Sequence, residues 1–156
     1  MALFYLTAAS VLILDQVTKL WIRANLEIGD SVFEWGIFAI VRIPPNAGAA
    51  FGLFKDMSLL LTIVAAAMAS LLIAAPILLR RRASWLNNRL TRLSFGLVLG
   101  GTLGNLFDRI QPSLGGVTDF IQVGWWPTFN IADSAISVGV AIFIFYVFRL
   151  GRQGAL

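Results

Sequence analysis

The sequence contains neither cysteine nor histidine among its 156 residues. Their absence excludes disulfide bonds, thiol nucleophiles, imidazole bases and the side-chain sets that most often bind zinc. Charged residues are also scarce, at 13% of the chain, whereas 58% of the side chains are hydrophobic. Any chemistry must therefore use carboxylate, hydroxyl, amide or lysine groups, in a chain too apolar for a soluble domain of this size.

Long apolar stretches account for most of this hydrophobicity. A membrane-spanning helix needs about 20 predominantly apolar residues, and four stretches come close to that length. The sequence therefore predicts an all-α integral membrane protein with four transmembrane helices, forming a single domain over residues 1–156. The expected spans cover about residues 2–22, 58–79, 93–110 and 132–149.

The first expected span carries two charged residues, Asp15 and Lys19. They stand four residues apart, which places them on one helical face where they can pair. We interpret them as a structural ion pair, because charges inside membranes usually pair or face the bundle interior. No basic segment precedes this span, so we expect it to be retained and not cleaved as a signal peptide.

The first two spans are separated by residues 23–57, a loop too long to be a simple connection. Its residues 32–43 are rich in β-forming side chains, so we expect a small extracytoplasmic β-sheet between helices 1 and 2, lying on the membrane. Residues 46–52 then supply small side chains that let the backbone approach another molecule. Gly48 and Phe51 are candidate binding residues there, with Phe51 as an apolar anchor, although a plain interfacial turn has a similar composition.

Arginines are distributed unevenly along the chain. Five arginines and no acid lie between the second and third spans, and two more follow the fourth span. The positive-inside rule makes such segments cytoplasmic, so we expect both termini in the cytoplasm and the acids toward the outer side. Membrane topology also explains the net charge of +4. A protein that binds nucleic acid should instead carry its basic residues on a soluble face.

The third span combines a packing pattern with a polar end. Glycines recur every four residues from Gly96 to Gly104, a spacing that lets membrane helices pack closely. Asn105, Asp108 and Arg109 follow at positions that share one helical face. Polar groups do gather at interfaces, but this face emerges on the side where two further acids lie, which favours a role in a site, with Asp108 as a structural residue.

Those two acids are Asp119 and Asp133, which flank a short Trp-Trp-Pro turn and could converge on one point. Ionisable groups at membrane helices are costly to desolvate and are functional candidates. Asn130 followed by Asp133 also matches a helix capping box, but capping leaves Asp119 unexplained. If packing brings the carboxyl groups within hydrogen-bond distance, they cannot both stay ionised and the pair holds one proton. One member could then deprotonate water while the other protonates an amide carbonyl, without a metal.

Three other functions use the same residue types. Intramembrane acids make proton relays, which would suit a small proton-coupled carrier, although carriers place charges near the bilayer midplane and usually show an internal repeat. The acids could instead bind magnesium or calcium through oxygen ligands, against which the nearby Arg109 argues. A serine/lysine peptidase is the third possibility, since Lys19, Lys55 and several serines are present.

Five segments together resemble the bacterial lipoprotein signal peptidase family, also called signal peptidase II. They occur in the family's order and are spread over the whole chain, which makes the match specific. The segments are DQVTK from Asp15 to Lys19, NAGAAFG from Asn46 to Gly52, GGTLGNLFDR from Gly100 to Arg109, GVTDF from Gly116 to Phe120 and FNIADS from Phe129 to Ser134.

The resemblance implies an aspartic endopeptidase of the bacterial inner membrane that removes signal peptides from prolipoproteins. Such an enzyme cuts before a cysteine that carries diacylglyceryl, with Asp119 and Asp133 as its catalytic dyad and the loop of residues 23–57 as its β-cradle and lid. It would work without a cofactor, as a monomer among membrane phospholipids, and the cyclic peptide globomycin would inhibit it. Four residues would line or order the substrate site: Asn46, Asn105, Arg109 and Asn130.

Overall fold

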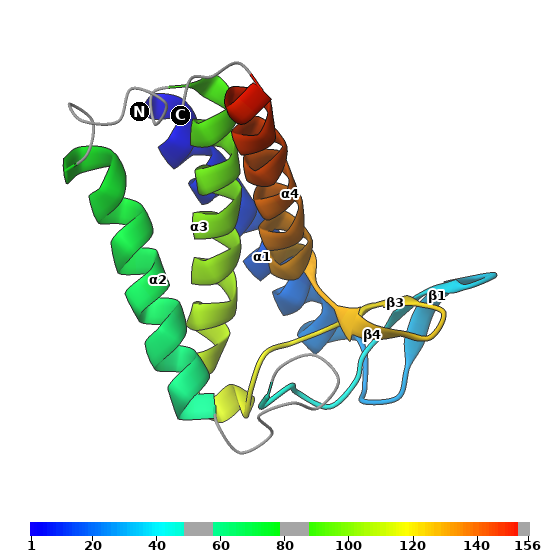
Figure 1. Cartoon of the computed structure of the whole chain (residues 1–156). Coiled ribbons are helices and arrows are strands. Elements are labelled where there is room, and N and C mark those ends of the chain that lie inside the picture. The colour runs from blue at the N-terminus through cyan, green and yellow to red at the C-terminus, as the bar shows by residue number, and fades with distance from the viewer. Residues whose placement is uncertain (49–57, 79–87, 153–156) are drawn as a thin grey trace.

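The computed structural model describes residues 1–48, 58–78 and 88–152. Four long helices form a bundle, and a small sheet projects from one end of it (Figure 1). Helix α1 begins, and α4 ends, at the opposite end of the bundle from the sheet (Figure 1). The predicted fold class is confirmed. The helices are α1 (Ala2–Asn25), α2 (Ser58–Leu78), α3 (Arg89–Arg109) and α4 (Ile131–Arg152); Phe51, Lys55, Arg80, Arg81 and Arg82 lie outside the described residues.

Helix α3 is the centre of the bundle and packs against the other three helices. Its glycines make this possible: a Cβ atom at Gly96 would lie 2.8 Å from the carbonyl oxygen of Phe4, and one at Gly100 would lie 2.6 Å from that of Ala8. Both distances are shorter than van der Waals contact, so any larger side chain would push α1 away from α3. The glycine spacing therefore sets how closely the two helices approach.

Three of the described helices are long and apolar enough to cross a membrane: α1, α2 over Ser58–Ala75, and α4. Their outer faces carry exposed apolar side chains such as Leu6, Leu59 and Phe148, as expected where a helix meets lipid instead of water. Helix α3 is less apolar because most of its surface meets other helices. It can therefore carry small and polar residues that lipid-facing helices exclude.

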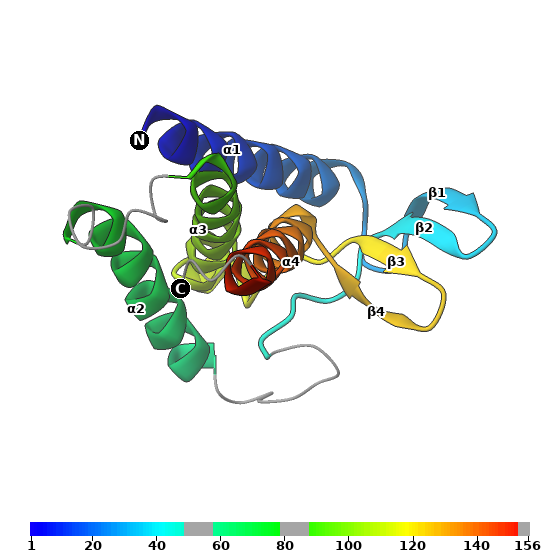
Figure 2. The ribbon, with the colours of Figure 1, turned by 45° about the horizontal axis from the view of Figure 1, so that its top comes forward.

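The sheet has four antiparallel strands in the order β1-β2-β3-β4 and lies on the side of the bundle away from α2 (Figure 2). The sheet predicted between α1 and α2 is confirmed, but the segment between these helices supplies only half of its strands. The other half comes from the segment between α3 and α4, for which we expected a turn. The strands are β1 (Ser31–Trp35), β2 (Phe38–Val41), β3 (Ile121–Val123) and β4 (Trp126–Phe129).

Pairing of β2 with β3 joins two loops that are distant in sequence, with Ala39 opposite Gln122. A separate antiparallel bridge continues the contact, since Asn46 and Val117 exchange backbone hydrogen bonds of 2.8 and 3.0 Å. Gly116 fits beside this bridge with a φ of +150°, where a Cβ atom would lie 2.6 Å from the Asn46 carbonyl oxygen. The bridge holds Asn46 close to the segment that carries Asp119.

Candidate active site

A cavity of about 330 Å³ opens where α3, α4 and the two paired loops meet. Asp119 and Asp133 both line it, although they come from different elements, so the predicted convergence of the two acids is observed. Asn46, Gly48, Asn105 and Arg109, which the sequence also predicted, line the same cavity. The remaining lining residues are Val117, Trp126, Pro127, Thr128, Phe129, Ile136 and Ser137.

Asp119 follows the end of the Asn46–Val117 bridge and is only 2% exposed. Its carboxylate accepts hydrogen bonds from Asn46 Nδ2 at 2.9 Å and from Asn130 Nδ2 at 2.7 Å. Burial raises the pKa of Asp119 from 3.8 to about 6; the hydrogen bond from Asn46 opposes this rise and the negative charge of Asp133 adds to it. Asp119 therefore keeps its proton more readily than an ordinary carboxyl group.

Asp133 lies in the first turn of α4, where it completes the predicted capping box with Asn130. The Asp133 backbone N–H donates to Asn130 Oδ1 at 2.9 Å, and the Asn130 backbone N–H donates to Asp133 Oδ2 at 3.2 Å. Asn105 Nδ2 also donates to Asp133 Oδ1 at 2.7 Å. The Asp133 carboxylate therefore has two hydrogen-bond donors and lies at the N-terminus of α4. Capping and membership of the site are thus compatible roles for one residue.

Asn130 is fully buried and lies behind the two aspartates instead of on the cavity wall. Its side-chain nitrogen donates to Asp119 Oδ1 at 2.7 Å and to Asn105 Oδ1 at 3.1 Å. Of the two roles expected for Asn130, lining the site or ordering it, this position suits the second. The structure makes it the residue that connects the carboxylates to each other.

Arg109 reaches the cavity from the last turn of α3. Its Nε is buried and has no hydrogen-bond partner in the described part of the chain. The residue also lines a second cavity of about 200 Å³ between α2, α3 and α4, which shares Asn105 and Ile136 with the first. Apolar side chains of α2, including Leu61 and Met68, form the other wall. A cationic donor therefore lies where the cavity that holds the two aspartates meets a second cavity lined by α2.

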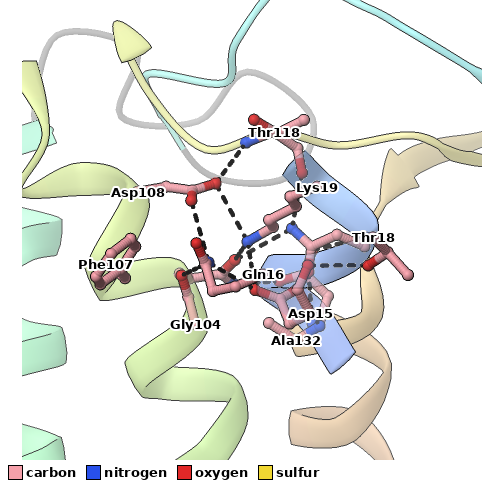
Figure 3. Close-up of polar contacts among 12 residues, drawn as sticks. Asp15, Gln16, Thr18, Lys19, Gly104, Phe107, Asp108, Thr118 and Ala132 are labelled. Carbon is pink, nitrogen blue, oxygen red and sulfur yellow. Dashed lines mark hydrogen bonds and ion pairs between the residues drawn. The ribbon is translucent and has the colours of Figure 1, made fainter. Parts of the chain in front are cut away.

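A buried ionic cluster lies between α1 and α3 (Figure 3). The expected pair is observed, with 2.9 Å between Lys19 Nζ and Asp15 Oδ2. Asp108 joins it, at 3.3 Å from Lys19 Nζ and 3.6 Å from Arg23 Nη1. Gln16 Nε2 donates to both carboxylates. Gln16 and Arg23 were not expected in this cluster, although Arg23 stands four residues after Lys19 and that spacing indicates a shared helical face.

The rival interpretations find less support in the geometry. Among the residues that the structure describes, no group of three acidic, histidine or cysteine side chains is placed to hold a metal ion. Lys19 is engaged in the ionic cluster with Asp15 and Asp108, so it is not available as the base of a serine/lysine pair.

Comparisons with known proteins agree with one another. The signal peptidase II family, described as "Signal peptidase (SPase) II", matches residues 7–149. A lipoprotein signal peptidase of Dehalococcoides mccartyi (strain CBDB1) is 42% identical over 137 residues, which cover 88% of this chain and 83% of that protein. One from Moorella thermoacetica is 38% identical over 152 residues, 97% of each protein. A solved structure described as a bacterial membrane enzyme superposes with a TM-score of 0.86 at 30% identity, covering 98% of this chain and 92% of that one.

Proposed function

Because the chain belongs to the signal peptidase II family, we propose that Asp119 and Asp133 are the catalytic dyad of an aspartic endopeptidase. The substrate is a prolipoprotein, and the bond cleaved is the amide before a cysteine that carries diacylglyceryl. One observation carries this proposal: the two carboxylates line one cavity from separate elements and share Asn130 as a hydrogen-bond donor.

The two aspartates differ in their surroundings, which assigns them different roles. Asp119 is buried and its pKa is raised to about 6, so it carries the shared proton and serves as the acid. Asp133 accepts hydrogen bonds from Asn105 and from the Asn130 backbone at the start of α4, and it faces the cavity, so it serves as the base. Two carboxyl groups with different surroundings in one active site can divide the roles of acid and base in this way.

The reaction then proceeds in two proton-balanced steps. Asp133 takes a proton from water while the water oxygen attacks the scissile carbonyl carbon, and Asp119 gives its proton to the carbonyl oxygen. The resulting tetrahedral diol collapses as Asp133 passes its proton to the leaving nitrogen and Asp119 recovers one from the diol. The carbon–nitrogen bond breaks, which releases the signal peptide with a carboxyl terminus and the lipid-modified cysteine with a free amine.

Substrate contacts are proposed for the residues at the rim of the dyad. Arg109 has a donor without a partner among the described residues and is placed to bind a carbonyl oxygen of the peptide. Gly48 lines the cavity, and its backbone N–H is held by Asn46 Oδ1 at 3.0 Å, so the loop backbone is ordered beside the site. Phe51 remains a proposed apolar anchor on sequence grounds. Globomycin, as a cyclic peptide, would occupy the same cavity.

The membrane placement is also a proposal. The described arginines Arg89, Arg92, Arg149 and Arg152 belong to the ends of α3 and α4 that lie opposite the sheet (Figure 1). The positive-inside rule puts that end in the cytoplasm, which supports an inner-membrane protein with both termini inside and the dyad at the outer face. We propose that it acts there as a monomer among phospholipids.

The test is turnover of a diacylglyceryl-modified prolipoprotein by purified Asp119→Asn and Asp133→Asn proteins. Each should lose about 100-fold to 10,000-fold in rate, because general acid/base catalysis is worth that much. Asp30→Asn, which changes an exposed loop aspartate, is the matched control and should behave as the parent. Near-parental turnover by either dyad variant, with a parental melting curve and gel-filtration profile, would disprove the mechanism.

Two further measurements in the same assay test whether the reaction needs a metal and whether it needs the lipid on the substrate. EDTA should leave the rate unchanged, because the two carboxyl groups supply both proton steps. An unmodified precursor at equal concentration should be cleaved much more slowly, since binding energy from the acyl chains can position the scissile bond. Loss of activity in EDTA, or equal cleavage of both precursors, would contradict the corresponding part.

A further inference from the structure

Lys19 is completely buried and lies at the centre of the ionic cluster (Figure 3). Its ammonium group has three donors and three acceptors around it. These are Asp15 Oδ2 at 2.9 Å, Asp108 Oδ2 at 3.3 Å and Asn105 Oδ1 at 3.0 Å. Each of these three residues also forms a hydrogen bond with Asp119 or Asp133 or with the residue that precedes one of them.

Asp15 connects Lys19 to the start of α4. Its second oxygen, Oδ1, accepts a 3.0 Å hydrogen bond from the backbone N–H of Ala132, the residue before Asp133. The first turn of a helix leaves its backbone N–H groups without intrahelical partners, so a carboxylate from α1 satisfies one of them. The helix end that presents Asp133 is thereby attached to α1.

Asp108 makes the equivalent connection to the other aspartate. Its Oδ2 accepts a 3.0 Å hydrogen bond from the backbone N–H of Thr118, the residue before Asp119. Arg23 Nη1 donates to the Thr118 hydroxyl at 2.8 Å and lies 3.6 Å from Asp108. Each aspartate of the dyad thus follows a residue whose backbone N–H is held by a carboxylate bound to Lys19.

Asn105 supplies the third connection, directly to a carboxylate of the dyad. An ammonium group can only donate, so Lys19 requires the oxygen of the Asn105 amide to face it, and Asn130 Nδ2 donates to the same oxygen at 3.1 Å. The amide nitrogen must then point the other way, where it donates to Asp133 Oδ1 at 2.7 Å. The lysine therefore selects the amide orientation that keeps a donor on Asp133.

We propose that Lys19 is a positioning residue for catalysis, which sets the relative placement of Asp119 and Asp133 through Asp15, Asp108 and Asn105. It does not touch the substrate. This inference rests on the proposed dyad, and it goes beyond the ion pair that the sequence analysis assigned to Lys19.

A purely structural role for Lys19 makes a different prediction. The four charges of the cluster, on Asp15, Lys19, Arg23 and Asp108, sum to zero, and a buried charge without a partner is strongly destabilising. If Lys19 only balances charge, any variant that restores the balance should restore turnover. If it positions the dyad, turnover should depend on a donor at this position even when the charge is balanced.

A pair of double variants separates the two roles. Lys19→Gln with Asp15→Asn and Lys19→Met with Asp15→Asn have the same net charge and side chains of similar length at position 19. The asparagine oxygen at position 15 can still accept from the Ala132 N–H. Only the glutamine amide can donate to Asn105. The parent, both double variants and the control Asp30→Asn are purified and compared at equal folded amounts, judged by gel filtration and melting.

We expect the glutamine variant to turn over between about 10-fold and 100-fold faster than the methionine variant, since a misplacement of about 1 Å can cost about 100-fold. KM should be the same in both, because the substrate contacts are untouched. Equal kcat in the two variants, or a difference confined to KM, would overturn the proposal.

A third variant keeps the inference testable if the methionine variant does not fold. Asn105→Asp keeps the four charged residues of the cluster and still presents an acceptor to Lys19, but it adds a negative charge and exchanges the donor to Asp133 for a carboxylate oxygen. The acid limb of the kcat profile should move to higher pH, because added negative charge opposes ionisation of the pair. An unchanged profile would overturn the proposal. Retained turnover in Asp119→Asn or Asp133→Asn would instead contradict the proposed dyad. Failure of the dyad and failure of the role of Lys19 are therefore distinguishable.

Discussion

Asn130 donates a 2.7 Å hydrogen bond from its side-chain amide to Asp119, while its backbone N–H donates to Asp133. One buried asparagine thus contacts both carboxylates, and it does so while capping the helix that carries one of them. The relative placement of the two acids therefore depends on a buried residue that does not line the cavity.

Replacing Asn130 by serine should separate these two functions. Serine caps helices about as well as asparagine, but it removes the donor to Asp119 and leaves a small gap. Leaving a buried polar group unpaired costs about 1–3 kcal/mol, so we expect a lower melting temperature and a loss of turnover of tenfold or more, in kcat. The same change at Asn88, which caps α3 through a 2.8 Å bond from the Leu90 N–H, should leave turnover unaffected. Equal turnover in the two variants would contradict the role of Asn130.

The raised pKa of Asp119 predicts a pH dependence of stability with a defined sign. The folded protein holds this proton up to about pH 6, whereas the ordinary value is 3.8, so protonation favours the folded state. The contribution of Asp119 is therefore most favourable below about pH 4, and it is progressively lost as the pH rises to about 6. Asp119→Asn cannot ionise, so its melting temperature relative to the parent should increase over that interval and then level off. A constant difference from pH 4 to pH 8 would show that Asp119 titrates normally.

The same group should shape the activity profile. If Asp119 is the acid, kcat/KM should fall as the pH rises through the value at which it ionises in the free enzyme, about 6. The measured values would belong to the coupled pair and not to either residue alone. A profile that keeps rising to pH 9 would exclude Asp119 as the proton donor.

Helix packing should matter for catalysis at a distance from the cavity. Alanine at Gly100 would place a Cβ atom 2.6 Å from the Ala8 carbonyl oxygen, and such overpacking costs about 1–3 kcal/mol. We expect a lower melting temperature and, because α1 carries Lys19 and α3 carries Asn105, a lower kcat. Gly151→Ala, at an exposed position near the end of α4, is the control. Parental kcat in a Gly100→Ala protein would show that the distance between α1 and α3 does not affect catalysis by the dyad.

Topology can be tested directly because the chain contains no cysteine. Ser31→Cys introduces a thiol on the exposed strand β1, and Arg152→Cys introduces one at the end of α4. A membrane-impermeant maleimide should reach the first from the outer side of the inner membrane, and the second only after permeabilisation. Labelling of both thiols from the same side would contradict the proposed orientation.

Local features were predictable from the sequence because the chain itself sets their spacing. Asp15 and Lys19 meet because four residues make about one helical turn, and Asn130 and Asp133 form a capping box for the same reason. Apolar stretches long enough to cross a bilayer indicate the helices, and the glycine repeat indicates which helix has close neighbours. Each of these predictions depends only on residues that lie near one another in the sequence.

Contacts between distant segments were decided only by the tertiary structure. Strand β3 pairs with β2, which belongs to a distant loop, and β4 pairs with β3; without that distant partner, the sequence of this segment indicated only a turn. Asp108 and Arg109, expected to act from one face of α3, diverge: Asp108 turns to Lys19 on α1 and Arg109 turns to the cavity. Which way the Asn105 amide points depends on a lysine 86 residues earlier. Residue spacing cannot specify such contacts, because they arise only when separate helices and loops pack together and each buried polar group must find its partner.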